Sequence, residues 1–217
     1  MTIATTTGWD ATHANINHVP STGQASLYIT GTADIVATAQ DLANHPGAVL
    51  IDQSPTINSV DTSADVFDCE TGAITTAELA QVIIDAQAHF KNNVRPGQRD
   101  PAVYCSRNNV TANVNALIAG GVKSCPLFVA DFNNSIGQAT AEVASETGPF
   151  PIIGRQYSDR GAFDLDVYSV PWLNTVSGGH TGPPLNQVGT VHSFTTNETA
   201  NVTTIDGGFT WKYTPKA

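Results

Sequence analysis

Basic residues are scarce in this sequence. Lys and Arg together number 9, against 19 Asp and Glu, and the formal net charge at pH 7 is −10. Nucleic-acid phosphates and anionic lipid headgroups would repel such a chain, so we expect neither nucleic acid nor a membrane among its partners. The same charge gives no electrostatic help in holding the protein to an anionic cell wall.

Long apolar runs are absent as well. No stretch approaches the roughly 18 consecutive apolar residues of a membrane-spanning helix. The opening MTIATTTGWD lacks the basic and apolar segments of a signal peptide. We therefore expect a protein that is made in the cytoplasm and carries no signal peptide or transmembrane segment.

The common patterns for metal and nucleotide binding are also missing. The three cysteines, Cys69, Cys105 and Cys125, have no zinc-site spacing, which favours small buried residues in a protein made under reducing conditions. No nucleotide-binding loop and no nucleophilic-serine motif is present. Neither a metal nor a cofactor is predicted.

What the sequence does contain is an alternation of short apolar runs with helical patterns. At 217 residues, of which 41% are hydrophobic, the chain can bury one sizeable core. Eight runs have the length and composition of strands, namely residues 8–12, 26–30, 48–52, 64–70, 101–106, 126–132, 152–158 and 163–170.

Helical patterns lie between several of these runs. The clearest is TTAELAQVIIDAQAHFKN, residues 75–92, in which Thr75 and Glu78 have the spacing of a capping box. Its apolar stripe recurs at helical spacing and consists of Leu79, Val82, Ile83, Ala86 and Phe90. Weaker helical patterns cover residues 33–44, 108–120 and 135–146.

Strands that are joined through helices imply parallel neighbours, because a parallel pair needs a long crossover connection. Eight such strands predict an α/β fold with a closed (β/α) barrel of the TIM type. The strand region is short against the roughly 250 residues of a complete barrel, so several helices must be reduced and the barrel irregular. A doubly wound sheet is the alternative.

The composition changes toward the end of the chain. We expect the barrel to occupy residues 1–174, and the Gly/Pro-rich segment 175–187 to be a linker. Residues 188–217 are Thr-rich with β-type alternation and an Asp206-Gly207 turn signal, which predicts a β-hairpin extension. So small an element should dock on the barrel or on a partner.

Acidic residues recur at the strand ends. In DVFDCETG, residues 65–72, Asp68 and Glu70 would point to the same side of a strand. Other polar residues at strand ends are Asp10, Asp52, Tyr104, Asp131, Gln156, Tyr157, Asp164 and Asp166. The carboxyl ends of barrel strands carry the chemistry, and crowded acids raise the pKa of at least one carboxyl group. A proton donor beside ionised carboxylates is what glycosidic cleavage requires, although clustered acids also bind cations.

Several motifs, taken in order, resemble those of glycoside hydrolase family 25 lysozymes, and of related glycoside hydrolase-like proteins of actinobacteria and their phages. These motifs are GWDATHA (8–14), DVFDCE (65–70), PAVYCS (101–106), LFVADF (127–132) and RQYSDRGAFDLD (155–166). The resemblance implies an irregular barrel of five β/α units followed by bare strands. It also implies cleavage of peptidoglycan between N-acetylmuramic acid and N-acetylglucosamine.

By this resemblance Glu70 is the general acid, Asp68 is the partner carboxylate, and Asp10 and Asp164 are the other catalytic acids. The resemblance also implies substrate contacts for Tyr104, Gln156, Tyr157 and His13, and the strand-end pattern adds Asp52 and Asp131. Three features depart from the lysozymes: Arg155 replaces an aromatic residue, Asp52 has no counterpart, and the second strand ends at Thr30 without an acid.

The leading hypothesis is therefore a lysozyme-like muramidase, a hydrolase that acts on the cell wall or is carried on a phage particle. The alternative is a non-catalytic carbohydrate-binding protein or a virion structural protein of a tail or capsid that reuses the barrel. In that case residues 188–217 would bind other virion proteins. Hydrolysis of another glycan is a third hypothesis, because a fold does not fix a substrate.

Overall fold

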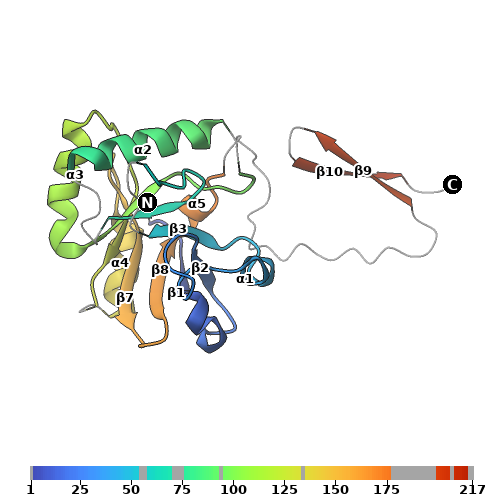
Figure 1. Ribbon diagram of the computed structural model, residues 1–217, viewed down its shortest axis with the longest axis horizontal. Coiled ribbons are helices and arrows are strands. Elements are labelled where there is room, and N and C mark those ends of the chain that lie inside the picture. Colours follow the sequence, from blue (N-terminus) through green and yellow to red (C-terminus); the bar gives the residue numbers. More distant parts are fainter. Residues whose placement is uncertain are drawn as a thin grey trace. The chain divides into compact units, whose positions relative to one another are not determined.

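The structure is a computed structural model (Figure 1). It describes residues 2–53, 58–69, 76–92, 95–132, 135–176, 199–205 and 208–214. The chain divides into two compact units, Met1–His180 and Thr181–Ala217.

The first unit is built on a closed eight-stranded barrel in which each strand neighbours the next in sequence and β8 closes onto β1. Its strands are β1 (Thr5–Ala11), β2 (Gln24–Tyr28), β3 (Val49–Gln53), β4 (Val66–Asp68), β5 (Ala102–Ser106), β6 (Leu127–Ala130), β7 (Ile152–Asp159) and β8 (Asp164–Ser169). All eight strand predictions from the sequence overlap these elements, and the closed α/β barrel with few helices is confirmed.

The strand directions differ from the expected parallel arrangement. Strands β1 to β7 pair in parallel, whereas β8 is antiparallel to both of its neighbours, β7 and β1. The reason is the connection between β7 and β8, which spans only residues 160–163. So short a segment can form a hairpin but cannot make a crossover.

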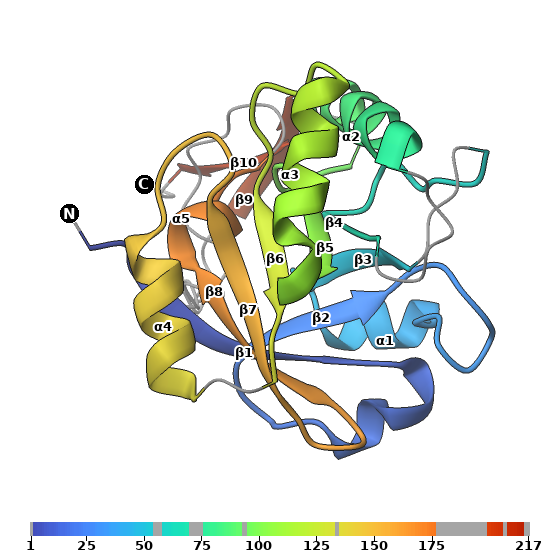
Figure 2. The same ribbon diagram turned by 90° about the vertical axis from the view of Figure 1, so that its left-hand side faces the viewer.

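Few helices accompany the strands (Figure 2). They are α1 (Ala39–Asn44), α2 (Thr76–Lys91), α3 (Val110–Ala119), α4 (Ile136–Ser145) and α5 (Val170–Leu173), with the short 3₁₀ helices η1 (His13–His18) and η2 (Arg107–Asn109). The predicted helix 33–44 is shortened to α1, because the Thr38 side chain caps it with Asp41 in a capping box. Thr75, the capping residue predicted for α2, lies outside the described residues.

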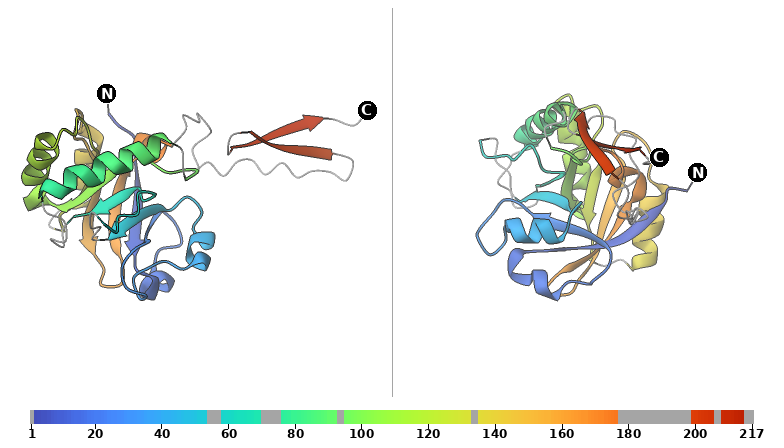
Figure 3. Two further views of the ribbon diagram at one scale, coloured as in Figure 1. Left: turned by 45° about the horizontal axis from the view of Figure 1, so that its top comes forward. Right: turned by 90° about the vertical axis from the view of Figure 1, so that its right-hand side faces the viewer.

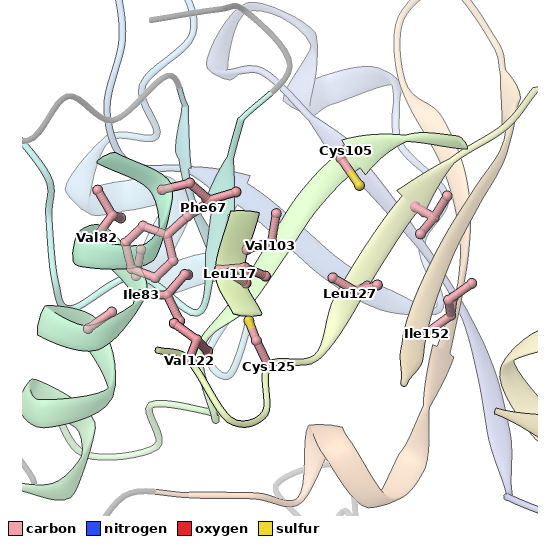
Figure 4. Close-up of a cluster of buried hydrophobic side chains, with 14 of the residues drawn as sticks. Phe67, Val82, Ile83, Val103, Cys105, Leu117, Val122, Cys125, Leu127 and Ile152 are labelled. Carbon is pink, nitrogen blue, oxygen red and sulfur yellow. The ribbon is translucent and has the colours of Figure 1, made fainter. Parts of the chain in front are cut away.

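The main apolar core lies between the outer face of the sheet and the helices α2 and α3 (Figure 4). Phe67 and Val103 on the strands pack there with Ile83 and Leu117 on the two helices. The cysteines fit the sequence prediction of small apolar residues: Cys105 and Cys125 are fully buried, and Cys69 is partly buried.

A second core fills the barrel interior with stacked aromatic rings. The ring centroids of Tyr104 and Phe128 lie 5.4 Å apart, and those of Phe128 and Tyr168 lie 5.3 Å apart. Trp172 continues the stack at 6.4 Å from Tyr168. Aromatic side chains bury large areas, so this column accounts for much of the interior packing.

Two glycines make room for these rings. A Cβ atom at Gly154 would lie 1.9 Å from the ring of Phe128, and one at Gly8 would lie 2.6 Å from the ring of Tyr168. Any larger residue at either position would force the ring out of the stack. The two glycines thus determine where the rings of Phe128 and Tyr168 lie in the barrel interior.

A buried ionic group occupies the strand ends opposite the predicted site. Asp65, directly before β4, accepts hydrogen bonds from the Arg99 backbone at 2.7 Å and from the Arg95 guanidinium at 2.5 Å. The Arg99 guanidinium also donates to the carbonyl oxygens of Gly47, at 2.7 Å, and Leu173, at 3.3 Å. These bonds tie the start of the barrel strands to the segment that follows β8.

The second unit contains a two-stranded antiparallel hairpin of β9 (Thr199–Ile205) and β10 (Gly208–Thr214), which can be followed in Figure 3. Its register pairs Thr199 with Thr214 and Ile205 with Gly208. None of the helices in the described part of the chain combines the length and the apolar character needed to cross a membrane.

Candidate active site

Strand alternation and register bring polar side chains together at one end of the barrel. Asp10 on β1 pairs with Asp164, the first residue of the antiparallel strand β8. On the same end, Asp68 at the last position of β4 pairs with Tyr104 on β5. Because β8 runs against the other strands, its first residue meets their last residues, and both supply the rim.

Gln156 on β7 links two of these carboxyl groups. Its side-chain Nε2 donates to Asp10 Oδ2 at 2.6 Å and to Asp164 Oδ2 at 2.9 Å. Its Oε1 accepts a hydrogen bond from the Tyr104 hydroxyl. Only the NH₂ group of an amide can donate twice, so the bridge fixes the orientation of Gln156.

An open pocket of about 240 Å³ leads to this bridge. Asp10, Asp164 and Tyr28 line it from the barrel, and the Tyr28 hydroxyl donates to Asp10 Oδ1 at 3.2 Å. The other walls come from the 3₁₀ helix η1, with Asn15, and from the β7–β8 hairpin, with Phe163. The pocket thus combines carboxyl groups, a phenol, an amide and one aromatic ring.

Burial and neighbouring negative charges raise the pKa of two carboxyl groups that line the pocket, Asp10 and Asp164. Burial, followed by the charge of Asp164, raises the pKa of Asp10 from 3.8 to about 7, although the bonds from Tyr28 and Gln156 oppose this effect. Burial, followed by the charge of Asp159, raises the pKa of Asp164 to about 6. Near neutral pH this pair can therefore both hold and release a proton.

A second polar layer lies beneath the pair, inside the barrel. The Tyr168 hydroxyl donates to Asp166 Oδ2 at 2.8 Å and lies 2.5 Å from the Ser26 hydroxyl. Asp166, Tyr168 and Ser26 are all fully buried. Burial, followed by the charge of Asp10, raises the pKa of Asp166 well above its ordinary value.

Of the two acids of the Asp-x-Glu motif, the described part of the structure includes Asp68 but not Glu70. Asp68 is buried, and its negative charge contributes to the raised pKa of Asp10. Glu70, the predicted general acid, lies outside the described residues. Its role stays a prediction.

Three predicted substrate residues are placed away from the Asp10–Gln156–Asp164 bridge. Asp52 accepts hydrogen bonds from the Thr30 hydroxyl at 2.5 Å and from the Asp61 backbone at 2.7 Å, so it stabilises loops. His13 bonds Asp41 at 2.6 Å, next to the start of α1. Tyr157 packs against the outer core. Their substrate contacts stay predictions.

Asp131 belongs to a separate group, which we call the outer ion-pair cluster and which consists of Arg107, Asp131, Glu142 and Arg155. The fully buried Arg155 contacts Asp131 at 3.2 Å and Glu142 at 2.9 Å. Arg107 contacts the same two acids. Arg155 follows the inward-facing Gly154 and precedes Gln156, so strand alternation turns it to the outer face.

Sequence reasoning did not assign a role to Tyr28, Ser26 or Phe163, although Tyr28 and Phe163 line the pocket and Ser26 contacts Tyr168. For Tyr28 a signal existed: it lies two residues after Ser26, the register partner of Asp10, and therefore faces the same side of the sheet. Phe163 carries no such pattern, because its place depends on the hairpin.

Within the described residues, no three His, Cys, Asp or Glu side chains are grouped as ligands of one metal ion. The described site thus offers carboxyl, amide and phenol groups for proton transfer and for hydrogen bonds to hydroxyl groups.

Comparison with known proteins yields no match. No protein-family model, no curated protein and no solved structure matches the chain. The functional argument therefore depends on the residues and geometry described above.

Proposed function

We propose that this chain is a glycoside hydrolase of the muramidase type, which cleaves peptidoglycan on a TIM-type barrel with reduced helices. One observation supports it most strongly: two carboxyl groups, Asp10 and Asp164, are joined through Gln156 at an open pocket, and both have a raised pKa. Such crowding of buried carboxyl groups is the condition under which glycosidases keep a neighbouring general acid protonated near neutral pH.

Hydrolysis of a glycosidic bond needs a proton for the leaving oxygen and stabilisation of the positive charge that develops on the sugar ring. In our proposal Glu70 donates that proton and regains one from the attacking water. Asp68, two residues earlier on the strand, orients the N-acetyl group of the substrate as an internal nucleophile. Asp10 and Asp164 hold sugar hydroxyl groups, and their negative charge helps to keep the proton on Glu70.

The pocket suits a sugar ring. Its carboxyl, phenol and amide groups can bond hydroxyl groups, and Phe163 can pack against the apolar face of a pyranose. The hydrogen bond from the Tyr104 hydroxyl to Gln156 Oε1 fixes the orientation of the amide that bridges the two carboxyl groups. Such preorganised polar groups are what sugar-binding sites require.

The test is the release of soluble fragments from purified peptidoglycan by Glu70→Gln and by the native protein. We expect this substitution to abolish release while the thermal unfolding midpoint stays the same. Asp85→Asn is the matched control, because Asp85 is an exposed acid on α2. Equal release by Glu70→Gln and by the control would refute the proposal.

A second candidate is a sugar-binding virion or wall protein that does not cleave its ligand. The separate hairpin unit favours it, because cleavage alone needs no such unit. Sedimentation of the native protein with peptidoglycan, without new reducing ends, would support this candidate. Residues 188–217 would then be the segment that attaches to other virion proteins.

A further inference from the structure

The residue beneath the pocket, Asp166, has no part in the proposed mechanism. Its side chain is fully buried, and its register partners are Gly8 on β1 and Gln156 on β7. It therefore lies one layer deeper in the barrel than Asp164, which is two residues away on the same strand. A carboxyl group at such a depth requires an explanation, because an uncompensated buried charge is strongly unfavourable.

No positive charge faces Asp166 among the described residues. The groups that interact with it are Asp10 on β1, Ser26 and Tyr28 on β2, Gln156 and Tyr157 on β7, and Asp164 and Tyr168 on its own strand. The nearest cation in sequence, Arg160, is exposed in the β7–β8 hairpin, and Arg155 lies on the outer face of β7 in the outer ion-pair cluster. None of the ion pairs in the described part of the chain includes Asp166.

The hydrogen bonds of Asp166 fit a neutral acid better than a carboxylate. Oδ2 accepts one bond, from the Tyr168 hydroxyl at 2.8 Å. Oδ1 is buried without a hydrogen-bond partner among the described residues. A carboxylate would place a full negative charge in this buried site with a single donor to stabilise it, whereas a neutral acid has no charge to compensate.

Tyr168 depends on the same arrangement. Its ring lies against Gly8, where a Cβ atom would come within 2.6 Å of it, and its hydroxyl meets both Ser26 and Asp166. The ring also stacks on Phe128 below the bridge. Asp166 thus connects the aromatic column to the layer that carries Asp10.

We propose that Asp166 is a positioning residue of this site, held as the neutral acid, which anchors Tyr168 and keeps the layer beneath Asp10 free of charge. Its effect on cleavage rests on the proposed function, whereas its protonation state does not. The raised pKa of Asp166, caused first by burial and then by the charge of Asp10, agrees with this role.

Carboxyl-carbon NMR titration of the native protein tests the protonation state directly. We expect the Asp166 carboxyl carbon to keep the chemical shift of an acid between about pH 5 and 8, where an ordinary aspartate is ionised. A chemical shift typical of a carboxylate at pH 7 would overturn the proposal. This measurement needs neither a substrate nor a variant.

The variant Asp166→Asn tests the absence of charge, because asparagine has the same shape and is neutral at every pH. The titration midpoint of Asp10 should be the same in this variant and in the native protein. A midpoint that falls by a pH unit or more would show that Asp166 carries a charge in the native protein, and would refute the proposal.

The pH dependence of unfolding gives a second readout. A folded-state pKa that is raised above the unfolded value makes stability fall as pH rises from about 4 toward the folded pKa, by up to tenfold in the unfolding constant per pH unit. Asp166→Asn should lack this one-proton component. An identical pH dependence in the variant and the native protein would contradict the proposal.

The anchoring role is tested by activity. Asp166→Ala removes the acceptor of Tyr168 and should lower peptidoglycan cleavage at least tenfold, whereas Asp166→Asn should restore cleavage with the native pH profile. Full activity of Asp166→Ala would overturn the anchoring role. If the native protein does not cleave, the proposed function fails, and the NMR and unfolding results still decide the protonation state.

Discussion

Removal of the Asp164 charge should make Asp10 easier to ionise. In Asp164→Asn the side-chain oxygen can still accept the hydrogen bond of Gln156, so the bridge keeps its geometry while one negative charge disappears. Because the charge of Asp164 raises the pKa of Asp10, we expect the Asp10 pKa to fall in this variant.

The magnitude follows from the bridge. One nitrogen bonds Asp10 at 2.6 Å and Asp164 at 2.9 Å, so the two carboxyl groups are close neighbours. At about 5 Å and an effective dielectric constant of about 20, two unit charges repel by roughly 3 kcal/mol. Asp164 is partly exposed, and screening by water leaves about 1 to 2 kcal/mol, which is about one pH unit.

The assay is a carboxyl-carbon NMR titration of Asp10 in the native protein, in Asp164→Asn and in the exposed-acid control Asp85→Asn. We expect a midpoint of about 7 in the native protein and in the control, and a midpoint about one pH unit lower in Asp164→Asn. An unchanged or higher midpoint in Asp164→Asn, with the fold retained, would refute the electrostatic account of the site.

Three further predictions concern stability. Because the pKa of Asp10 is raised from 3.8 to about 7, folding stability should fall by about 3 kcal/mol as pH rises from about 4 to 7, and urea unfolding of Asp10→Asn should show a smaller fall. Gly154→Ala should lower stability by about 2 kcal/mol or more, measured by thermal unfolding, because the added methyl group meets the Phe128 ring. Arg155→Met should cost about 3 kcal/mol in the same assay, because it leaves the acids of the outer ion-pair cluster with one partner instead of two. A change below about 0.5 kcal/mol in either variant would contradict the packing and ion-pair arguments.

The strand positions were predictable because each apolar run is short and bounded by turn residues. The direction of β8 was not predicted, because strand patterns contain no direction and the parallel expectation was extended to strands whose connecting helices were expected to be reduced. The four residues 160–163 between β7 and β8 were the available signal. They are too few for a crossover, so a hairpin follows.

The convergence of Asp10, Gln156 and Asp164 could be expected from their positions at strand ends. Whether a strand-end residue faces the barrel interior or the outside depends in addition on strand alternation. Asp131 follows Ala130, a residue of the barrel-interior core, so alternation places it on the outer face with Arg155. Asp52 likewise follows Ile51 in the interior core. Strand ends alone do not distinguish inward from outward acids.

Hydrogen-bond partners could not be predicted at all. The bridge of Gln156 joins residues 146 positions apart in the sequence, and the contact of Ser26 with Tyr168 spans 142 positions. Such pairs depend on the stagger of strands around the barrel, which no local pattern determines. The raised pKa of Asp10 follows from these contacts and from burial, so its extent was also beyond sequence reasoning.

Mass analysis of purified peptidoglycan after incubation with the native protein tests the central claim most directly. The account predicts soluble fragments with N-acetylmuramic acid at the reducing end, released in proportion to protein and incubation time. Peptidoglycan recovered without any new reducing end, at protein concentrations that saturate binding, would contradict it.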